Sequence, residues 1–152
     1  MTSELLESFG IYGGSIIVAF IAGLFPLFSI EVFLVGIAAK FEPTIGELIV
    51  CCVLAATSHQ VAKSMCYYAG VGVLERGRLK AKLDKARPKI EKWNKAPKLM
   101  MALGATVGIP PLYLLAFIAE PIMQMRFWMF TAIVFAGRLG RFFVLAVIPL
   151  LL

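Results

Sequence analysis

The chain has 152 residues, of which 61% are hydrophobic and 16% are charged, and its formal net charge is +6. Soluble domains are about 45–50% apolar and about 25% charged, so a water-soluble fold of this length has too few polar residues to cover its apolar surface. The composition excludes an ordinary soluble domain and predicts an integral membrane protein.

Most of the apolar residues fall into four long blocks: residues 10–39, 45–74, 99–119 and 121–152. A helix needs about 20 apolar residues to cross the hydrocarbon core of a bilayer, so the blocks predict an all-α, polytopic fold. A cleaved signal peptide is not expected, because residues 1–8 contain two Glu and no Lys or Arg, whereas a signal peptide begins with positive charge.

The first block is interrupted at Gly23 and Pro26 and carries one charge, Glu31. Proline inside a helix removes a backbone hydrogen bond, and freed backbone groups cannot face lipid, so we expect a re-entrant hairpin that enters the membrane and returns. An ionisable side chain at membrane depth indicates function, which makes Glu31 a candidate substrate-binding residue. A poorly solvated carboxyl favours its protonated form and can carry protons, or it pairs with a cationic group. The alternative is a structural tether that binds free N–H groups of the hairpin.

The second block carries His59 and Lys63, which are four residues apart and therefore lie on one face of a helix. We expect both side chains to line a cavity and to bind substrate. A single histidine with no acidic neighbour is a poor metal site, and the three cysteines of this block have no metal-ligand spacing. The sequence therefore predicts no metal and no cofactor.

A basic segment, residues 75–98, separates the second block from the third. It contains ten of the fifteen Lys and Arg residues and only three acidic residues. A short basic loop between spans faces the cytoplasm, so we predict a cytoplasmic loop that also contacts anionic lipid headgroups. A nucleic-acid interface is the rival interpretation of a basic run, and the flanking apolar blocks argue against it.

The third block repeats the pattern of the first break. Residues 108–113, which include Gly108, Pro110 and Pro111, and residues 23–28 both read Gly, aliphatic, any residue, Pro, Leu, aromatic. Interrupted segments at matching positions in two halves are typical of transporter binding sites. The alternative is that these prolines only kink ordinary spans.

The two breaks predict a single membrane domain, residues 1–152, made of two half-repeats at about 10–75 and 98–152 joined by the basic loop. Each half has a re-entrant helical hairpin followed by one transmembrane helix. Since each half then crosses the membrane once, the halves have opposite orientations and form an inverted repeat.

The last block carries Arg138 and Arg141 about halfway along its length. We expect these side chains to pair with Glu31 or to clamp a phosphate, because the planar guanidinium matches phosphate oxygens. The alternative is that both snorkel toward lipid headgroups.

Four segments carry a resemblance to a known family: Pro26-Leu27-Phe28-Ser29-Ile30-Glu31 before an apolar helix, Ser58-His59-Gln60 with Tyr67-Tyr68-Ala69-Gly70, Gly108-Ile109-Pro110-Pro111, and a last helix beginning near Arg126-Phe127. In this order they resemble the DedA/VTT (SNARE-associated Golgi protein-like) superfamily of membrane proteins. The resemblance implies two re-entrant loops and movement of phospholipids or polyprenyl-phosphate carriers between leaflets, by scrambling or by proton-coupled flipping.

The chain departs from this family around the second loop. Family members carry arginines there, in a pattern like Gly-Arg-x-x-Pro-Gly-x-Arg, where this chain has Val107, Gly108, Leu112 and Tyr113. The departure keeps open the alternative of a structural or assembly subunit that moves no lipid.

The predicted function is a membrane lipid transporter or scramblase, with Glu31 near the path of the headgroup. The sequence has no nucleophile elbow, phosphate loop or zinc-protease signature, so an enzyme is not expected. The alternatives are the non-transporting subunit and a proton-coupled exporter of small molecules. We expect a multi-pass protein of a bacterial or archaeal plasma membrane, with membrane lipids as partners and no nucleic acid. Because 152 residues shield two hairpins poorly from lipid, we also expect a homo-oligomer or a partner membrane protein.

Overall fold

The computed structural model describes residues 2–25, 29–74, 76, 80–81, 84–85, 88, 97–109 and 111–151. Within these ranges the chain forms helices, turns and loops, with no strand, which confirms the predicted all-α class for this part of the chain. Pro26, Pro110 and most of the basic loop lie outside the described residues.

The helices follow one another in the order α1 (Thr2–Leu24), α2 (Ile30–Phe41), α3 (Ile45–Leu74), α5 (Pro97–Thr106), α6 (Leu112–Ile118), α7 (Phe127–Phe142), the π-helical turn η1 (Phe143–Val147) and α8 (Ile148–Leu151). Within α1, Gly10 has non-helical backbone angles (φ 68°, ψ 178°) and kinks the helix. The apolar part of α1, Phe9–Leu24, therefore begins at this kink.

Two helices of the described part are long and apolar enough to cross a membrane: α3, with 30 residues, and the continuous helix Phe127–Val147, with 21 residues. At 1.5 Å per residue they are about 45 Å and about 31 Å long, and a hydrocarbon core is about 30 Å thick. Their length and composition hint at association with a membrane.

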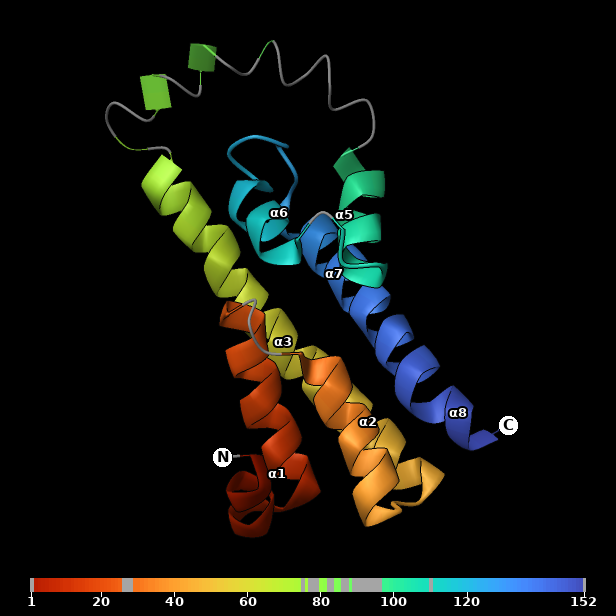
Figure 1. Cartoon of the computed structure of the whole chain (residues 1–152). Helices are drawn as coiled ribbons and strands as arrows, with labels where there is room; N and C mark the ends of the chain where they lie inside the picture. The colour runs from red at the N-terminus through yellow and green to blue at the C-terminus, as the bar shows by residue number, and fades with distance from the viewer. Residues whose placement is uncertain are drawn as a thin grey trace.

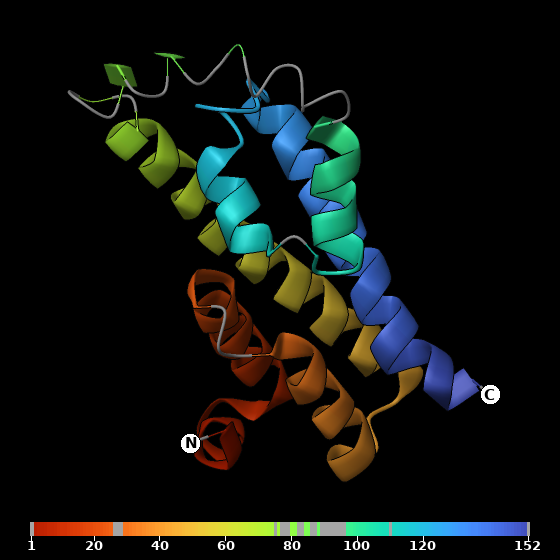
Figure 2. The same cartoon turned by 45° about the horizontal axis from the view of Figure 1, so that its top comes forward.

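Two helical hairpins pack against these long helices (Figure 1). α1 runs along α3 and α2 returns beside it, whereas the shorter pair α5 and α6 packs against α7 and α3. In both views the end of α1 and the start of α2, like the end of α5 and the start of α6, lie near the middle of α3, and the hairpins extend away from there in opposite directions (Figure 2).

Gly23 allows the end of α1 to approach α3 closely. A Cβ atom at this position would lie 2.5 Å from Ala62 Cβ and 3.2 Å from the His59 carbonyl oxygen. Any larger residue would push the two helices apart, so this glycine fixes where the first hairpin turns relative to α3.

Gly108 lies two residues after the end of α5, in the second hairpin. Its φ is +90°, and its N–H and that of Val107 both donate to the Leu103 carbonyl, at 3.1 Å and 2.8 Å. A left-handed glycine that closes a helix in this way turns the chain sharply. The chain then reaches Pro111, which is the N-cap residue of α6.

The buried apolar residues form two separate clusters. The first joins α1, α2, the first half of α3 up to Ala56, and the end of the last helix from Phe142; the second joins α5, α6, the start of α7 up to Val134, and α3 from Tyr67. Between the two clusters, α3 carries four buried polar residues, Ser58, His59, Gln60 and Lys63, and the last helix carries Arg138 and Arg141, whose side chains are 12% and 27% exposed. The candidate site therefore lies between two apolar cores.

Candidate functional site

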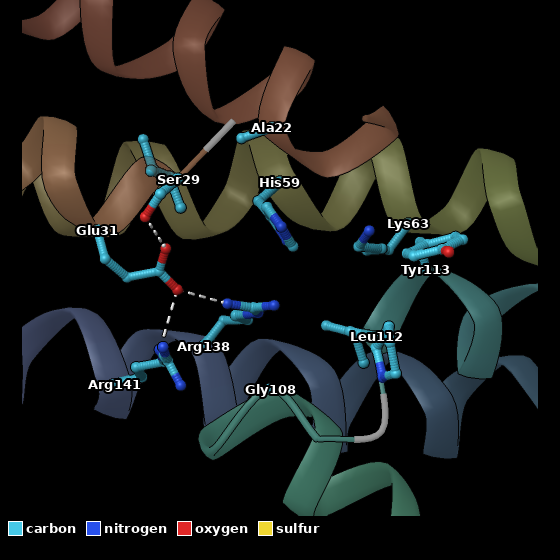
Figure 3. A pocket seen from close by; sticks show the side chains of 12 residues that line it. Ala22, Ser29, Glu31, His59, Lys63, Gly108, Leu112, Tyr113, Arg138 and Arg141 are labelled. Atoms are coloured by element: carbon cyan, nitrogen blue, oxygen red, sulfur yellow. Dashed lines mark hydrogen bonds and ion pairs between the residues drawn. The ribbon is translucent and has the colours of Figure 1, made fainter. Parts of the chain in front are cut away.

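A cavity of about 260 Å³ lies between the two hairpins. Its lining residues come from both hairpins, α3 and α7 (Figure 3): Ala22, Ser29, Ile30, Glu31, His59, Lys63, Gly108, Pro111, Leu112, Tyr113, Arg138 and Arg141. The five polar residues singled out in the sequence thus share one cavity, although they span more than 100 positions of the chain. Of the predicted breaks, Gly108 and Pro111 line it as well.

Glu31 lies in the first turn of α2 because Ser29 caps this helix. Ser29 Oγ accepts a hydrogen bond from the Val32 N–H at 3.4 Å and donates one to Glu31 Oε2 at 3.0 Å. Serine is a preferred N-cap residue, and a carboxylate is favourable at the positive end of a helix. The cap and the helix terminus together hold the carboxylate toward α7.

Two guanidiniums of α7 meet the carboxylate of Glu31 on its other oxygen. Arg138 Nη1 donates to Glu31 Oε1 at 2.8 Å, and Arg141 Nε lies 2.9 Å from the same atom as an ion pair. Two cations beside one carboxylate favour its ionised form. Glu31 therefore contacts cationic groups, which is one of the roles expected for it. Arg138 and Arg141 likewise pair with Glu31, which is one of the roles expected for them.

Arg141 also binds the second hairpin. Its Nη1 donates to the Thr106 carbonyl oxygen at 2.6 Å, at the last residue of α5. The last carbonyls of a helix have no partner within the helix, so this bond satisfies one of them. A single side chain on α7 thereby contacts both hairpins.

Lys63 binds the first hairpin from α3. Its side chain is 3% exposed, and its Nζ donates to the carbonyl oxygen of Gly23, in the last turn of α1. Gly23 does not line the cavity, but its backbone carbonyl positions Lys63, which does. The ammonium group fixes the end of α1 and still lines the cavity.

His59 is 2% exposed and lies one helical turn from Lys63. Its ring packs edge-on against Phe142, with ring centroids 6.4 Å apart, and its Nδ1 atom has no hydrogen-bond partner among the described residues. Figure 3 shows the ring pointing between α3 and α7, toward Arg138. Buried polar atoms are nearly always hydrogen-bonded, so this nitrogen is suited to contact a ligand or water in the cavity.

The described lining residues carry an excess of positive charge. Lys63, Arg138 and Arg141 are cationic and only Glu31 is anionic, which leaves two positive charges without a carboxylate when His59 is neutral. Buried charges are costly unless they are paired. The cavity therefore favours a small anionic group. In the described part of the chain, no three His, Cys, Asp or Glu side chains gather where they could hold a metal ion.

Some members of the site were not predicted. Ser29 has a recognisable signal, because a serine just before a helix start is a common N-cap. Tyr113 of α6 lines the cavity beside Leu112, and a lone aromatic residue in an apolar block gives no signal of its own. The bond to the Thr106 carbonyl involves backbone, which leaves no pattern of side chains to read.

The chain was compared with protein-family models, with curated proteins and with solved structures, and no match was found. The described residues define an all-helical chain with two helices able to cross a membrane by length and composition. The resemblance to the DedA/VTT superfamily stays a prediction.

Proposed function

We propose that this chain is a multi-pass membrane protein that moves anionic lipids, phospholipid or polyprenyl-phosphate, between the two leaflets. The observation that carries the proposal is the cavity between the two hairpins, whose described lining has three cations and one carboxylate. A phosphate-bearing headgroup matches this charge, and the apolar helices around the cavity suit the lipid tails.

The proposed topology has α3 and the helix Phe127–Val147 crossing the bilayer. α2 and α5 have 12 and 10 residues, so they are about 18 Å and about 15 Å long and too short to cross a core of about 30 Å. Both hairpins are then re-entrant and enter from opposite sides, as in an inverted repeat. The basic loop at residues 75–98 faces the cytoplasm in this arrangement.

In the proposed mechanism the headgroup competes with Glu31 for Arg138 and Arg141. The oxygens of a phosphate can accept hydrogen bonds from the same planar guanidinium groups that bind the Glu31 carboxylate. Lys63 and His59 face the same space from α3 and supply further donors. Opposed hairpins shorten the apolar barrier, so the headgroup crosses through the cavity while the tails remain in lipid. This path agrees with the function that the DedA/VTT resemblance implies.

One observation favours a second candidate, a structural or assembly subunit that moves no lipid. Arg138 and Arg141 already have protein partners in Glu31 and the Thr106 carbonyl. In that role these contacts only hold α2, α5 and α7 together.

The test is a leaflet-exchange assay with purified full-length protein in liposomes that contain a trace of fluorescent phosphatidylglycerol. A membrane-impermeant reductant quenches the outer leaflet, and exchange exposes the inner leaflet to it. The proposal predicts loss of most of the protected fluorescence in vesicles with protein and not in empty vesicles. Protected fluorescence equal to that of empty vesicles would favour the subunit.

A further inference from the structure

An apolar groove of about 390 Å³ runs along α7 and η1, outside the cavity. Its lining is Thr106, Ala136, Gly137, Gly140, Arg141, Val144 and Leu145. Apart from Thr106 and Arg141, these residues are apolar, and several are small. The groove is therefore unsuited to a polar group and suited to a hydrocarbon chain.

The groove exists because α5 is much shorter than the helix on which it packs. Gly137 lies against α5 so closely that a Cβ atom there would be 2.6 Å from Ala105 Cβ. α5 ends one residue later, at Thr106, while the last helix continues to Val147. Beyond Thr106, the surface at Gly140 is open, since a Cβ atom there would meet nothing within 4 Å.

Arg141 connects the groove with the polar cavity. It lines both spaces, with Nε beside Glu31 and Nη1 on the Thr106 carbonyl. If the anionic head of a ligand lies in the cavity, its apolar part can therefore extend past this guanidinium into the groove. The charge at one end of the groove and the apolar lining beyond it match an anionic amphiphile.

From this continuity we infer that the groove holds an acyl chain of the lipid whose phosphate headgroup occupies the cavity. The inference rests on the proposed function in one respect, namely that the cavity takes a lipid headgroup. It adds where the tail lies and makes α7 a determinant of which lipids are accepted. A long acyl chain fits beside Gly140, and the excess positive charge of the cavity favours an anionic headgroup over a zwitterionic one.

The test is photolabelling of the purified full-length chain in detergent, with substoichiometric phosphatidic acid that carries a diazirine on one acyl chain. Phosphatidylcholine with the same chain is the matched probe. The blocking variant is Gly140→Leu, whose side chain enters open space in the groove. The matched control is Gly72→Leu, because Gly72 also has nothing within 4 Å of a Cβ atom and does not line the groove.

The inference predicts that phosphatidic acid labels residues 136–145 severalfold more than phosphatidylcholine does. Gly140→Leu should lower this label severalfold, while Gly72→Leu leaves it unchanged. Equal labelling of wild type and Gly140→Leu would overturn the inference. So would efficient disulfide formation between copies of Gly140→Cys in a background without the native cysteines, since the groove would then hold a second copy.

Photolabelling and leaflet exchange of the same proteins together distinguish the two proposals. Groove labelling without lipid exchange would support the acyl-chain site and contradict lipid movement. Lipid exchange without groove labelling would contradict only the acyl-chain site.

Discussion

One carboxylate oxygen, Glu31 Oε1, lies 2.8 Å from Arg138 Nη1 and 2.9 Å from Arg141 Nε. These contacts join the start of α2 to the middle of the last helix, across more than 100 positions of the chain. Both arginines are mostly buried, with 12% and 27% of their side chains exposed. The three side chains therefore connect α2 with the last helix and form the charged centre of the cavity.

Replacing Glu31 by Gln should lower thermal stability and raise the affinity for anions. Removing one partner of a buried ion pair costs about 3–5 kcal/mol, and we expect less here because the Glu31 side chain is 16% exposed. The measurement is the melting temperature of the purified variant in detergent, with and without phosphatidic acid. The lipid should raise the melting temperature of Glu31→Gln more than that of wild type. An equal increase in the melting temperatures of both proteins would contradict the proposed competition between Glu31 and the ligand.

Replacing Gly23 by Ala should destabilise the first hairpin. The new Cβ atom would overlap Ala62 Cβ and crowd the His59 carbonyl, and overpacking of this kind costs about 1–3 kcal/mol. It would also move the carbonyl that Lys63 binds. Gly36→Ala is the control, because a Cβ atom at Gly36 meets nothing within 4 Å. A melting temperature for Gly23→Ala that matches that of Gly36→Ala would contradict the close packing of α1 on α3.

The re-entrant topology can be tested with single cysteines at Thr2, Phe41 and Lys89 in a background without the native cysteines. A hairpin that returns puts Thr2 and Phe41 on the same side of the membrane, and Lys89 on the other side. An impermeant thiol reagent applied to intact and then to opened vesicles reports the side of each cysteine. If Thr2 and Phe41 react from opposite sides, the first block spans the membrane and the inverted repeat is wrong.

The convergence of the polar residues was partly predictable from the sequence. Glu31 is the only charge in residues 10–39 and therefore needs a partner from another block, and Arg138 and Arg141 were the natural partners for it. The shared face of His59 and Lys63 follows from their spacing. What could not be predicted was that all five residues line one cavity, because this depends on how two hairpins pack against α3 and α7.

Backbone partners and helix limits were the least predictable features. The bonds from Lys63 to the Gly23 carbonyl and from Arg141 to the Thr106 carbonyl leave no pattern in the sequence, since every residue has a carbonyl group. The last apolar block begins at Pro121, yet α7 begins only at Phe127, because residues 121–123 form a turn and residues 124–126 are irregular. Apolar composition shows which residues lipid or a protein core can cover, but it does not show where a helix begins.

The most direct test of the central claim is leaflet exchange of fluorescent phosphatidylglycerol by the variant Arg138→Gln. Arg141 remains to pair with Glu31, so the variant should fold, which its elution and helix content can verify. The matched control is Arg126→Gln, because Arg126 precedes α7 and does not line the cavity. The account predicts that Arg138→Gln loses most of the exchange and that Arg126→Gln retains it. Exchange by folded Arg138→Gln at the wild-type rate would contradict a headgroup path through this cavity.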